Sequence, residues 1–210
     1  MKPRARWAGV FLSVLCYSTG HAEVVLDGYA GVSFPHNLSS IDCGSPKFVC
    51  SSTIQLDTAP IVGARASYFF ERDKWFGIAA EGLHVSPNID QQTVTVTAPS
   101  STATYHTPQT HVDLYGGLLE AIARLPFWRV QPYVGGGLGL FHLSAGDSGL
   151  GAIHNTQAGL AFFAGAKVPV TERLALFVEV KHLKTRWPMR ALTSDYESEN
   201  VIGGLSWRFH

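Results

Sequence analysis

Residues 24–34 read VVLDGYAGVSF, and the alternation in this stretch decides the fold. The polar face of the stretch carries Asp27, Tyr29 and Ser33. The opposite face is apolar or small, and it carries Val24, Leu26, Gly28, Ala30, Val32 and Phe34. A strand with aliphatic side chains outside and polar ones inside fits a lipid bilayer, where a sheet must close into a barrel to satisfy its backbone groups. The stretch therefore predicts one wall of a membrane-spanning barrel.

The rest of the chain repeats this two-residue pattern between turn signals. Short turns and longer polar stretches separate eight candidate strands, at residues 24–34, 60–70, 75–86, 109–125, 130–144, 155–168, 173–185 and 199–209. We therefore expect an all-β fold, an eight-stranded antiparallel up-and-down transmembrane β-barrel.

The connections between these strands alternate between long and short. Meandering outer-membrane barrels have this asymmetry, with short periplasmic turns and longer loops at the cell surface. The barrel domain is expected to occupy residues 23–210, with four surface loops at about residues 35–59, 87–108, 145–154 and 186–198.

Charge placement distinguishes this fold from a soluble barrel or sandwich, which has the same period. A soluble sheet would carry charge on its outward faces, whereas the apolar faces here are almost free of it. An Arg or Lys that faces lipid at mid-bilayer costs about 2–4 kcal/mol, so its absence is informative. The strand at 109–125 is less regular, because placing Glu120 and Arg124 inward leaves Asp113 outward. Asp113 must then lie above the bilayer, or a bulge near Gly116 and Gly117 must change the register.

The overall composition agrees with a lipid-facing surface. Charged residues make up 15% of the chain, against about 25% in an average soluble domain. The formal net charge is zero, so the charge balance does not favour nucleic acid as a partner.

Residues 1–22 are expected to be a signal peptide. Positive residues precede a short apolar run, and the small residues Gly20 and Ala22 indicate cleavage before Glu23. A lipoprotein signal at Cys16 is disfavoured because a bulky leucine precedes that cysteine. No later segment reaches the roughly 18 apolar residues of a spanning helix, so the exported chain is expected to enter the outer membrane as strands.

Cys43 and Cys50 are the two cysteines that remain after the leader. A pair of cysteines in an exported protein predicts a disulfide, here closing a small loop. The alternative is a metal site with His36, but two thiols and one distant histidine match the spacing of known sites poorly. We therefore expect neither a metal nor a cofactor.

The inward faces are expected to hold a network of opposite charges. Eight strands enclose room only for side chains, so paired charges would fill the lumen, although a narrow solute channel is the alternative. The predicted network consists of Asp27, Glu81, Glu120 and Glu179 with Arg65, Arg124, Lys167, Lys181 and Arg208.

Two segments of the chain match a known group of proteins. The closing stretch VIGGLSWRF at 201–209 resembles the last strand of small OmpA-like and OmpX/Ail-like outer-membrane barrels, and LFVEVK at 176–181 resembles their penultimate strand. The resemblance covers the whole mature chain in layout and these two segments in motif. It implies that Trp207 and Phe209 belong to the signal that the barrel-assembly machinery recognises, in the envelope of a Gram-negative cell.

Histidines gather at the ends of the candidate strands next to the long loops. We expect most of them to point outward at headgroup level, as a collar that contacts lipopolysaccharide phosphates and binds them more strongly when the imidazoles are protonated. The alternative is that histidine simply suits a boundary between polar and apolar surroundings. The collar consists of His36, His84, His111, His142, His154 and His182.

A lipid A-modifying hydrolase is the catalytic alternative, since some eight-stranded barrels act on lipid A. Such a site would need a histidine and a serine on one strand and an acid on the next, all facing the membrane. His142 has Ser144 beside it, but an outward carboxylate to orient this histidine is hard to find unless Asp113 or Asp147 moves in. We therefore do not expect an enzyme.

The two longest loops favour a structural or surface-interaction role, as in adhesins and surface antigens. The alternating stretch 93–97 in the second of them predicts a hairpin above the membrane, whose exposed edge offers a place for a strand of a host or other extracellular protein. The expected partners are thus outer-membrane lipid and lipopolysaccharide, the assembly machinery and extracellular ligands of the loops.

Overall fold

The computed structural model of the chain is all-β. Among the residues that it describes, no helix is long and apolar enough to cross a membrane. The described residues are 23–36, 49–50, 56–89, 92–98, 101–107, 110–126, 129–145, 153–189 and 192–209.

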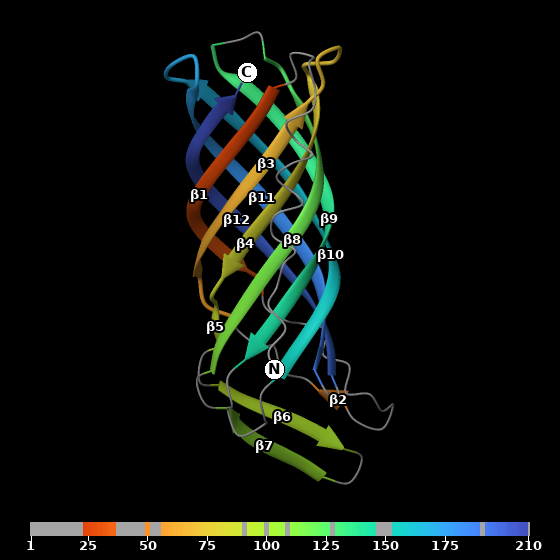
Figure 1. Cartoon of the computed structure of the whole chain (residues 1–210). Coiled ribbons are helices and arrows are strands. Elements are labelled where there is room, and N and C mark those ends of the chain that lie inside the picture. Colours follow the sequence, from red (N-terminus) through yellow and green to blue (C-terminus); the bar gives the residue numbers. More distant parts are fainter. Residues whose placement is uncertain are drawn as a thin grey trace, which may run out of the picture.

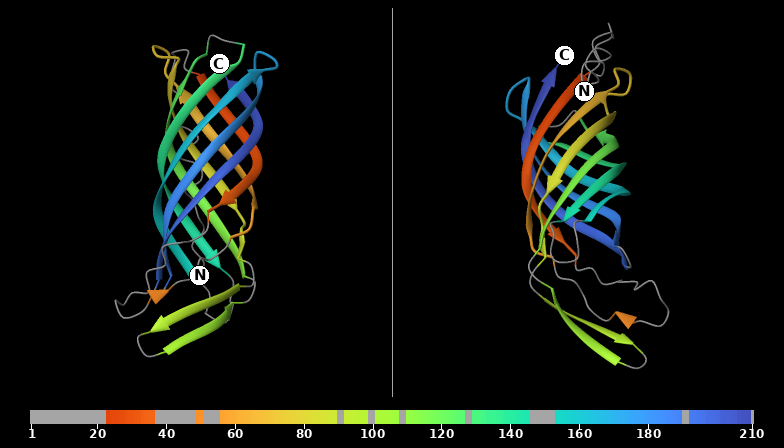
Figure 2. Two further views of the ribbon diagram at one scale, coloured as in Figure 1. Left: turned by 180° about the vertical axis from the view of Figure 1, so that it is seen from behind. Right: turned by 60° about the horizontal axis from the view of Figure 1, so that its bottom comes forward.

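Eight long tilted strands form a closed wall (Figure 1). Each pairs antiparallel with its neighbours in the chain, β4 pairs with β8, and β12 pairs with β1 to close the circle. Figure 2 shows the same continuous wall from behind. The predicted eight-stranded up-and-down barrel is confirmed. Its strands are β1 (Glu23–Pro35), β3 (Ala59–Phe69), β4 (Phe76–Val85), β8 (Thr110–Arg124), β9 (Gln131–Ala145), β10 (Ile153–Pro169), β11 (Leu174–Met189) and β12 (Leu192–Phe209).

The last two strands run further than the sequence predicted. We expected a surface loop at 186–198, but β11 and β12 stay paired through most of this range, as far as Met189 opposite Leu192. The polar composition of the range suggested a loop. Beyond the bilayer, however, polar side chains only show that the segment contacts water. Two adjacent strands can still pair there, because each satisfies the backbone hydrogen bonds of the other.

Further strands lie within the two longest predicted surface loops. β6 (Gln92–Ala98) and β7 (Ser101–Thr107) form the hairpin expected from the alternation at 93–97, and β2 (Val49–Cys50) pairs with β6. This three-stranded sheet projects from the barrel end opposite the C-terminus (Figure 1). The short strand β5 (Asn88–Ile89) pairs with the beginning of β8. The predicted signal peptide, Cys43 and the side chain of Cys50 lie outside the described residues, and the predicted disulfide therefore does too.

β8, the strand whose pattern at 109–125 was irregular, contains no bulge where it pairs with β4. β8 pairs with β4 in unbroken register from Leu114 to Ala123, so its side chains alternate without interruption. Glu120 and Arg124 are buried in the lumen, and Asp113 faces outward beyond the apolar part of the wall. Of the two alternatives, the position above the bilayer is therefore the one adopted.

Glycines on the inner face make room for aromatic rings. Tyr29 lies opposite Gly63 in the register, and a Cβ built on this glycine would overlap the tyrosine ring. Phe163 opposite Gly135 repeats the arrangement. Cross-strand packing of an aromatic ring on a glycine is a known device of sheets. It lets a narrow barrel hold large rings.

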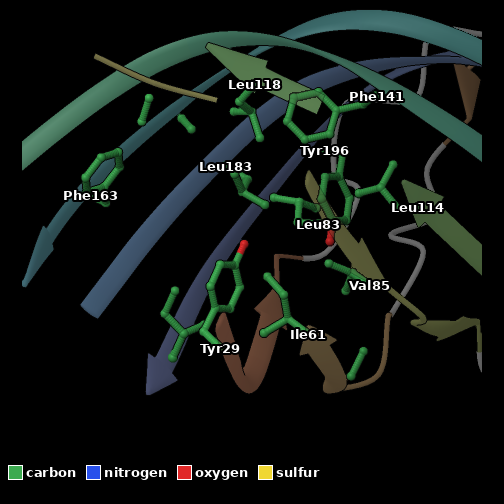
Figure 3. Packing of buried hydrophobic residues seen from close by; sticks show 14 of the residues in the cluster. Tyr29, Ile61, Leu83, Val85, Leu114, Leu118, Phe141, Phe163, Leu183 and Tyr196 are labelled. Carbon is green, nitrogen blue, oxygen red and sulfur yellow. The ribbon is translucent and has the colours of Figure 1, made fainter. Parts of the chain in front are cut away.

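The lumen next to the surface loops is apolar, which the sequence analysis did not predict. In β3, β4, β8, β11 and β12 these residues lie nearer the long loops than the inward charged residue of the same strand does, and in β9, which has no charged residue, Phe141 lies toward the loop end of the strand. Figure 3 shows that they point toward one another inside the barrel. We call this group the apolar plug, and it includes Ile61, Leu83, Val85, Leu114, Phe141, Leu183 and Tyr196.

Replacing Gly63 with Ala should destabilise the barrel by about 1–3 kcal/mol, the usual cost of overpacking, because the new methyl group displaces the Tyr29 ring. The matched control is Gly82→Ala on the outer face, where a Cβ meets nothing within 4 Å. Urea unfolding in detergent micelles, followed by tryptophan fluorescence, measures both changes. Equal stability of the two variants would contradict the packing described here.

Candidate functional site

Arg65 on β3 is the centre of the charges in the lumen. Its side chain is fully buried, and its Nη2 donates to Glu179 Oε2 at 2.6 Å. Its other nitrogens face carboxylates from three further strands. Nε lies 3.4 Å from Asp27, and Nη1 lies 3.5 Å from Glu120 and 3.8 Å from Glu81.

Lys181 on β11 is a second buried cation among the same acids. Its Nζ donates to both carboxylate oxygens of Glu81 and lies 3.4 Å from Glu120 and 3.6 Å from Glu179. Two tyrosine hydroxyls complete the arrangement. Tyr29 donates to Glu81 at 2.5 Å, and Tyr133 donates to Glu179 at 2.8 Å. Each charged side chain in this network therefore has an opposite charge and at least one hydrogen bond, as burial requires. Arg65 Nε and Nη1, Glu120 Oε2 and Glu179 Oε1 make no hydrogen bond and are compensated by charge alone.

Asp27 connects this network to the half of the lumen near the short turns. Its carboxylate accepts from Lys167 Nζ at 2.7 and 2.9 Å and from Ser206 Oγ at 2.5 Å. A small cavity beside Asp27, Arg65 and Lys167 has room for about one water molecule.

Two further arginines lie at the rim of the barrel near the short turns. Arg124 donates to both oxygens of Glu23 at 2.9 and 2.6 Å, and Arg208 Nε lies 2.7 Å from the same carboxylate. Arg124 also stacks on Phe69, with the guanidinium carbon 3.5 Å from the ring centroid. This rim cluster joins β1, β8 and β12 at their periplasmic ends.

The structure places the nine residues of the predicted charge network in two groups, seven around Arg65 and Lys181 and the other two, Arg124 and Arg208, at Glu23. Sequence reasoning missed Glu23, which it used only as a cleavage position, and it missed Tyr29 and Tyr133 as hydrogen-bond donors. The tyrosines share the inward parity of the charged residues, and that signal was available. The interpretation that charges alone fill the lumen is wrong, because the apolar plug fills the part next to the loops.

A polar collar surrounds the outside of the barrel where the apolar wall ends. His84, Tyr115, His142 and Thr156 form one continuous row of cross-strand partners over β4, β8, β9 and β10. His36, His111 and His182 are also exposed or half-exposed near this end of their strands. The side chain of His154 lies outside the described residues.

Most described collar histidines have carboxylate partners, which the sequence analysis did not foresee. Asp113 Oδ1 lies 3.0 Å from His84 Nε2 and 3.6 Å from His111 Nε2. The hydrogen bond from His84 is the main cause that holds the pKa of Asp113 below its ordinary value. On β12, Glu199 lies 2.8 Å from His182 Nδ1.

Glu197, one step further from the bilayer, completes the acidic part of the collar. It lies 4.0 Å from His36 and accepts a hydrogen bond from Lys184, which holds the pKa of this carboxyl below its ordinary value. The collar thus mixes both signs of charge rather than forming a purely basic ring.

Ser86, His84 and Asp113 approach one another but do not form a catalytic triad. Ser86 Oγ and Asp113 Oδ1 lie 3.1 and 3.0 Å from the same nitrogen, His84 Nε2. A carboxylate can only accept, so Nε2 carries the proton and is not a base toward the serine. In a catalytic triad the acid and the serine contact different nitrogens of the histidine ring.

The other serine considered, Ser144, lies opposite Asp113 in the register, while His142 contacts Thr156 Oγ1 at 2.9 Å. Ser86 is therefore not positioned for nucleophilic catalysis with His84 as its base.

The two aromatic residues of the last strand lie on the outer face. Trp207 and Phe209 are about half exposed, and their ring centroids are 6.5 Å apart. Trp75 and Phe76 lie near the same end of the barrel, in the aromatic girdle typical of membrane barrels at the lipid–water boundary.

A family model described as "outer membrane protein beta-barrel domain" matches residues 9–209. The chain belongs to this family. The protein therefore lies in the outer membrane, as the sequence predicted. Its apolar faces point outward because they contact lipid.

Solved structures share the fold of this outer-membrane barrel. Neisserial surface protein A is 16% identical with a TM-score of 0.59, over 90% of this chain and 99% of that one. OprG from Pseudomonas aeruginosa is 15% identical with a TM-score of 0.53, over 91% and 97%. Ail, the attachment invasion locus protein of Yersinia pestis, is 11% identical with a TM-score of 0.52, over 91% and 100%, in a complex with a heparin analogue.

No curated protein matches the chain significantly. At these identities the solved structures establish the fold, and they support the suspected similarity to OmpX/Ail-like barrels.

Replacing Arg65 with Met should lower the free energy of unfolding by about 3–5 kcal/mol, because it leaves buried carboxylates without their main counter-charge. The control is Arg72→Met in the exposed turn between β3 and β4, where a surface substitution changes stability by about 0.5 kcal/mol or less. Urea titration of the barrel in lipid vesicles gives both values. If Arg65→Met is as stable as the control, the network does not support the barrel in the way described.

Proposed function

We propose that this protein is a surface-interaction protein, in which a sealed barrel anchors a small extracellular β-sheet to the outer membrane. The observation that carries the proposal is the sheet formed by β2, β6 and β7. In the described part of the chain, β7 pairs only with β6, so its other edge offers unpaired backbone groups. Such an edge can accept a strand of a partner protein, with main-chain hydrogen bonds supplying affinity.

The filled lumen supports this role over that of a solute channel. A permeant solute would have to cross the charge network around Arg65 and then the apolar plug around Leu114, both of which are closed to solvent. Displacing either layer means separating buried ion pairs or opening a packed core. A barrel of eight strands is also too narrow for an aqueous channel beside its own side chains.

The collar geometry supports a non-enzymatic role, since the histidine nearest a serine and an acid presents the same nitrogen to both. The partners proposed for the assembled protein are outer-membrane lipid and lipopolysaccharide, with extracellular ligands at the loops. Trp207 and Phe209 face outward, as a signal for the assembly machinery would require. A Cys43–Cys50 disulfide would brace the extracellular sheet, because Cys50 pairs with Val96 of β6.

The purified protein should show no steady single-channel conductance in planar lipid bilayers. The reason is that two layers of the lumen, the buried ion pairs and the apolar plug, both block the passage of ions. The comparison is a wide porin inserted under the same conditions, which establishes that insertion gives a signal. Long-lived open levels that scale with the amount of inserted barrel would overturn the proposal of a sealed lumen.

Replacing residues 92–107 with a Gly-Ser linker should abolish adhesion of expressing bacteria to cultured host cells, because it removes β6 and β7 while leaving the barrel strands intact. The matched control replaces residues 187–194 with Asn-Gly, which shortens the β11–β12 hairpin just above Arg186 opposite Asp195. Heat-modifiable gel migration checks that both variants fold. Adhesion that survives the first deletion, or that both deletions reduce equally, would refute a role for the β6–β7 hairpin.

A further inference from the structure

The outer edge of β7 belongs to a segment without charged residues. Residues 92–107, which form β6, β7 and the turn between them, include no Asp, Glu, Lys or Arg. β7 itself, at Ser101–Thr107, also contains no proline. Natural proteins usually protect an exposed edge strand with charges or proline, because its unpaired backbone groups otherwise accept the strand of another chain. The sequence of β7 is thus typical of an edge that pairs.

We infer that the free edge of β7 pairs with the same edge of a second copy of this protein, carried by a neighbouring cell. The inference rests on the function proposed above, because it names a partner for the edge that carries that function. It adds that the protein connects one bacterial cell to another.

The orientation of the sheet selects a copy in another membrane. β6 lies nearer the barrel and β7 lies farther from it, along the direction of the barrel axis (Figures 1 and 2). The free edge of β7 therefore faces away from the membrane that holds the barrel. Two copies in one membrane would both direct this edge outward, so the two edges would not meet. A copy in a facing membrane presents its edge directly to the first.

The β7 edge is complementary to itself. A two-fold axis across this edge places the two copies of β7 antiparallel, which is also how β6 and β7 pair within one chain. The strand order β2-β6-β7 of one copy then continues as β7-β6-β2 of the other, in one sheet. Both β7 edges are satisfied in this arrangement, so the contact closes as a pair of copies instead of extending into a fibre.

Charge also favours a second copy as the partner. Like charges that lie opposite each other destabilise a strand pair. A second copy brings a strand as free of Asp, Glu, Lys and Arg as the first, so no such repulsion arises.

The contact is small, and its strength comes from the number of copies. β7 has seven residues, so one β7–β7 contact is far smaller than the interface of a stable protein complex. Many copies on two facing cell surfaces can act together, and such multivalent binding greatly exceeds the strength of each single contact. We therefore expect the association to appear between whole cells.

The first experiment mixes two bacterial populations that carry different fluorescent proteins. Both lack long surface polysaccharides, which would hold the two membranes apart. When both populations express the full protein, flow cytometry should detect mixed aggregates. When only one population expresses it, mixed aggregates should be absent, because the contact needs a copy on each cell. Mixed aggregates with non-expressing cells would overturn the inference, since the edge would then bind a different surface component.

The second experiment changes the charge of β7. The variant with Thr102→Lys, Thr104→Lys and His106→Lys should not aggregate with itself, because like charges meet across the antiparallel contact. The same three positions changed to Glu should also fail to aggregate alone. Mixing the Lys cells with the Glu cells should restore mixed aggregates. The matched control changes the three residues to Gln, which adds no charge, and it should aggregate like the unchanged protein.

Heat-modifiable migration establishes first that every variant barrel is folded. The inference is overturned if cells with the unchanged protein do not aggregate, if the Lys variant still aggregates with itself, or if the Lys and Glu variants do not complement each other. Adhesion to host cells separates this failure from that of the proposed function. If cells do not aggregate but replacing residues 92–107 still abolishes adhesion, only the second copy is the wrong partner. If neither aggregation nor adhesion depends on residues 92–107, both proposals are wrong.

Discussion

The ion pairs of the buried Arg65 guanidinium hold the barrel wall together from inside. This guanidinium faces carboxylates from β1, β4, β8 and β11, so one side chain ties together strands from around the whole circumference. No hydrophobic effect draws the walls of a lipid-embedded barrel inward, because lipid is as apolar as the outer face. Electrostatic attraction across the lumen provides that inward force, and Lys181 adds a second centre among the same acids.

The lumen is built in layers, each suited to its distance from water. The rim cluster of Glu23, Arg124 and Arg208 lies at the periplasmic end, the network around Arg65 comes next, and the apolar plug lies nearest the surface loops. The plug separates the buried ion pairs from extracellular water, and the low dielectric strengthens those pairs. Sealing and stability thus have the same origin.

Much of the fold could be predicted from the sequence, because lipid excludes charged side chains from one face of each strand. This exclusion determines which face points outward. Parity alone placed Glu81, Arg65 and Lys181 inside. It could not reveal the plug, because the pattern is reversed around Leu83 and Leu114. His84 and Asp113 lie on the outer face there, beyond the bilayer, where the polar-inside rule no longer applies. The pairing of His84 with Asp113 was also hidden, because it depends on the register between β4 and β8. The extension of β11 and β12 was missed since polar residues were taken as evidence for a loop.

The inner face of the barrel wall carries the charged side chains, and the outer face meets lipid. Spin labels placed one at a time along residues 174–182 of β11, in lipid bilayers, measure this most directly through accessibility to oxygen and to a water-soluble nickel complex. The structure predicts a two-residue period, with labels at 176, 178 and 180 open to oxygen dissolved in lipid and labels at 177, 179 and 181 protected from both reagents. Oxygen accessibility that peaks at 179 and 181, or that shows no alternation, would contradict the account.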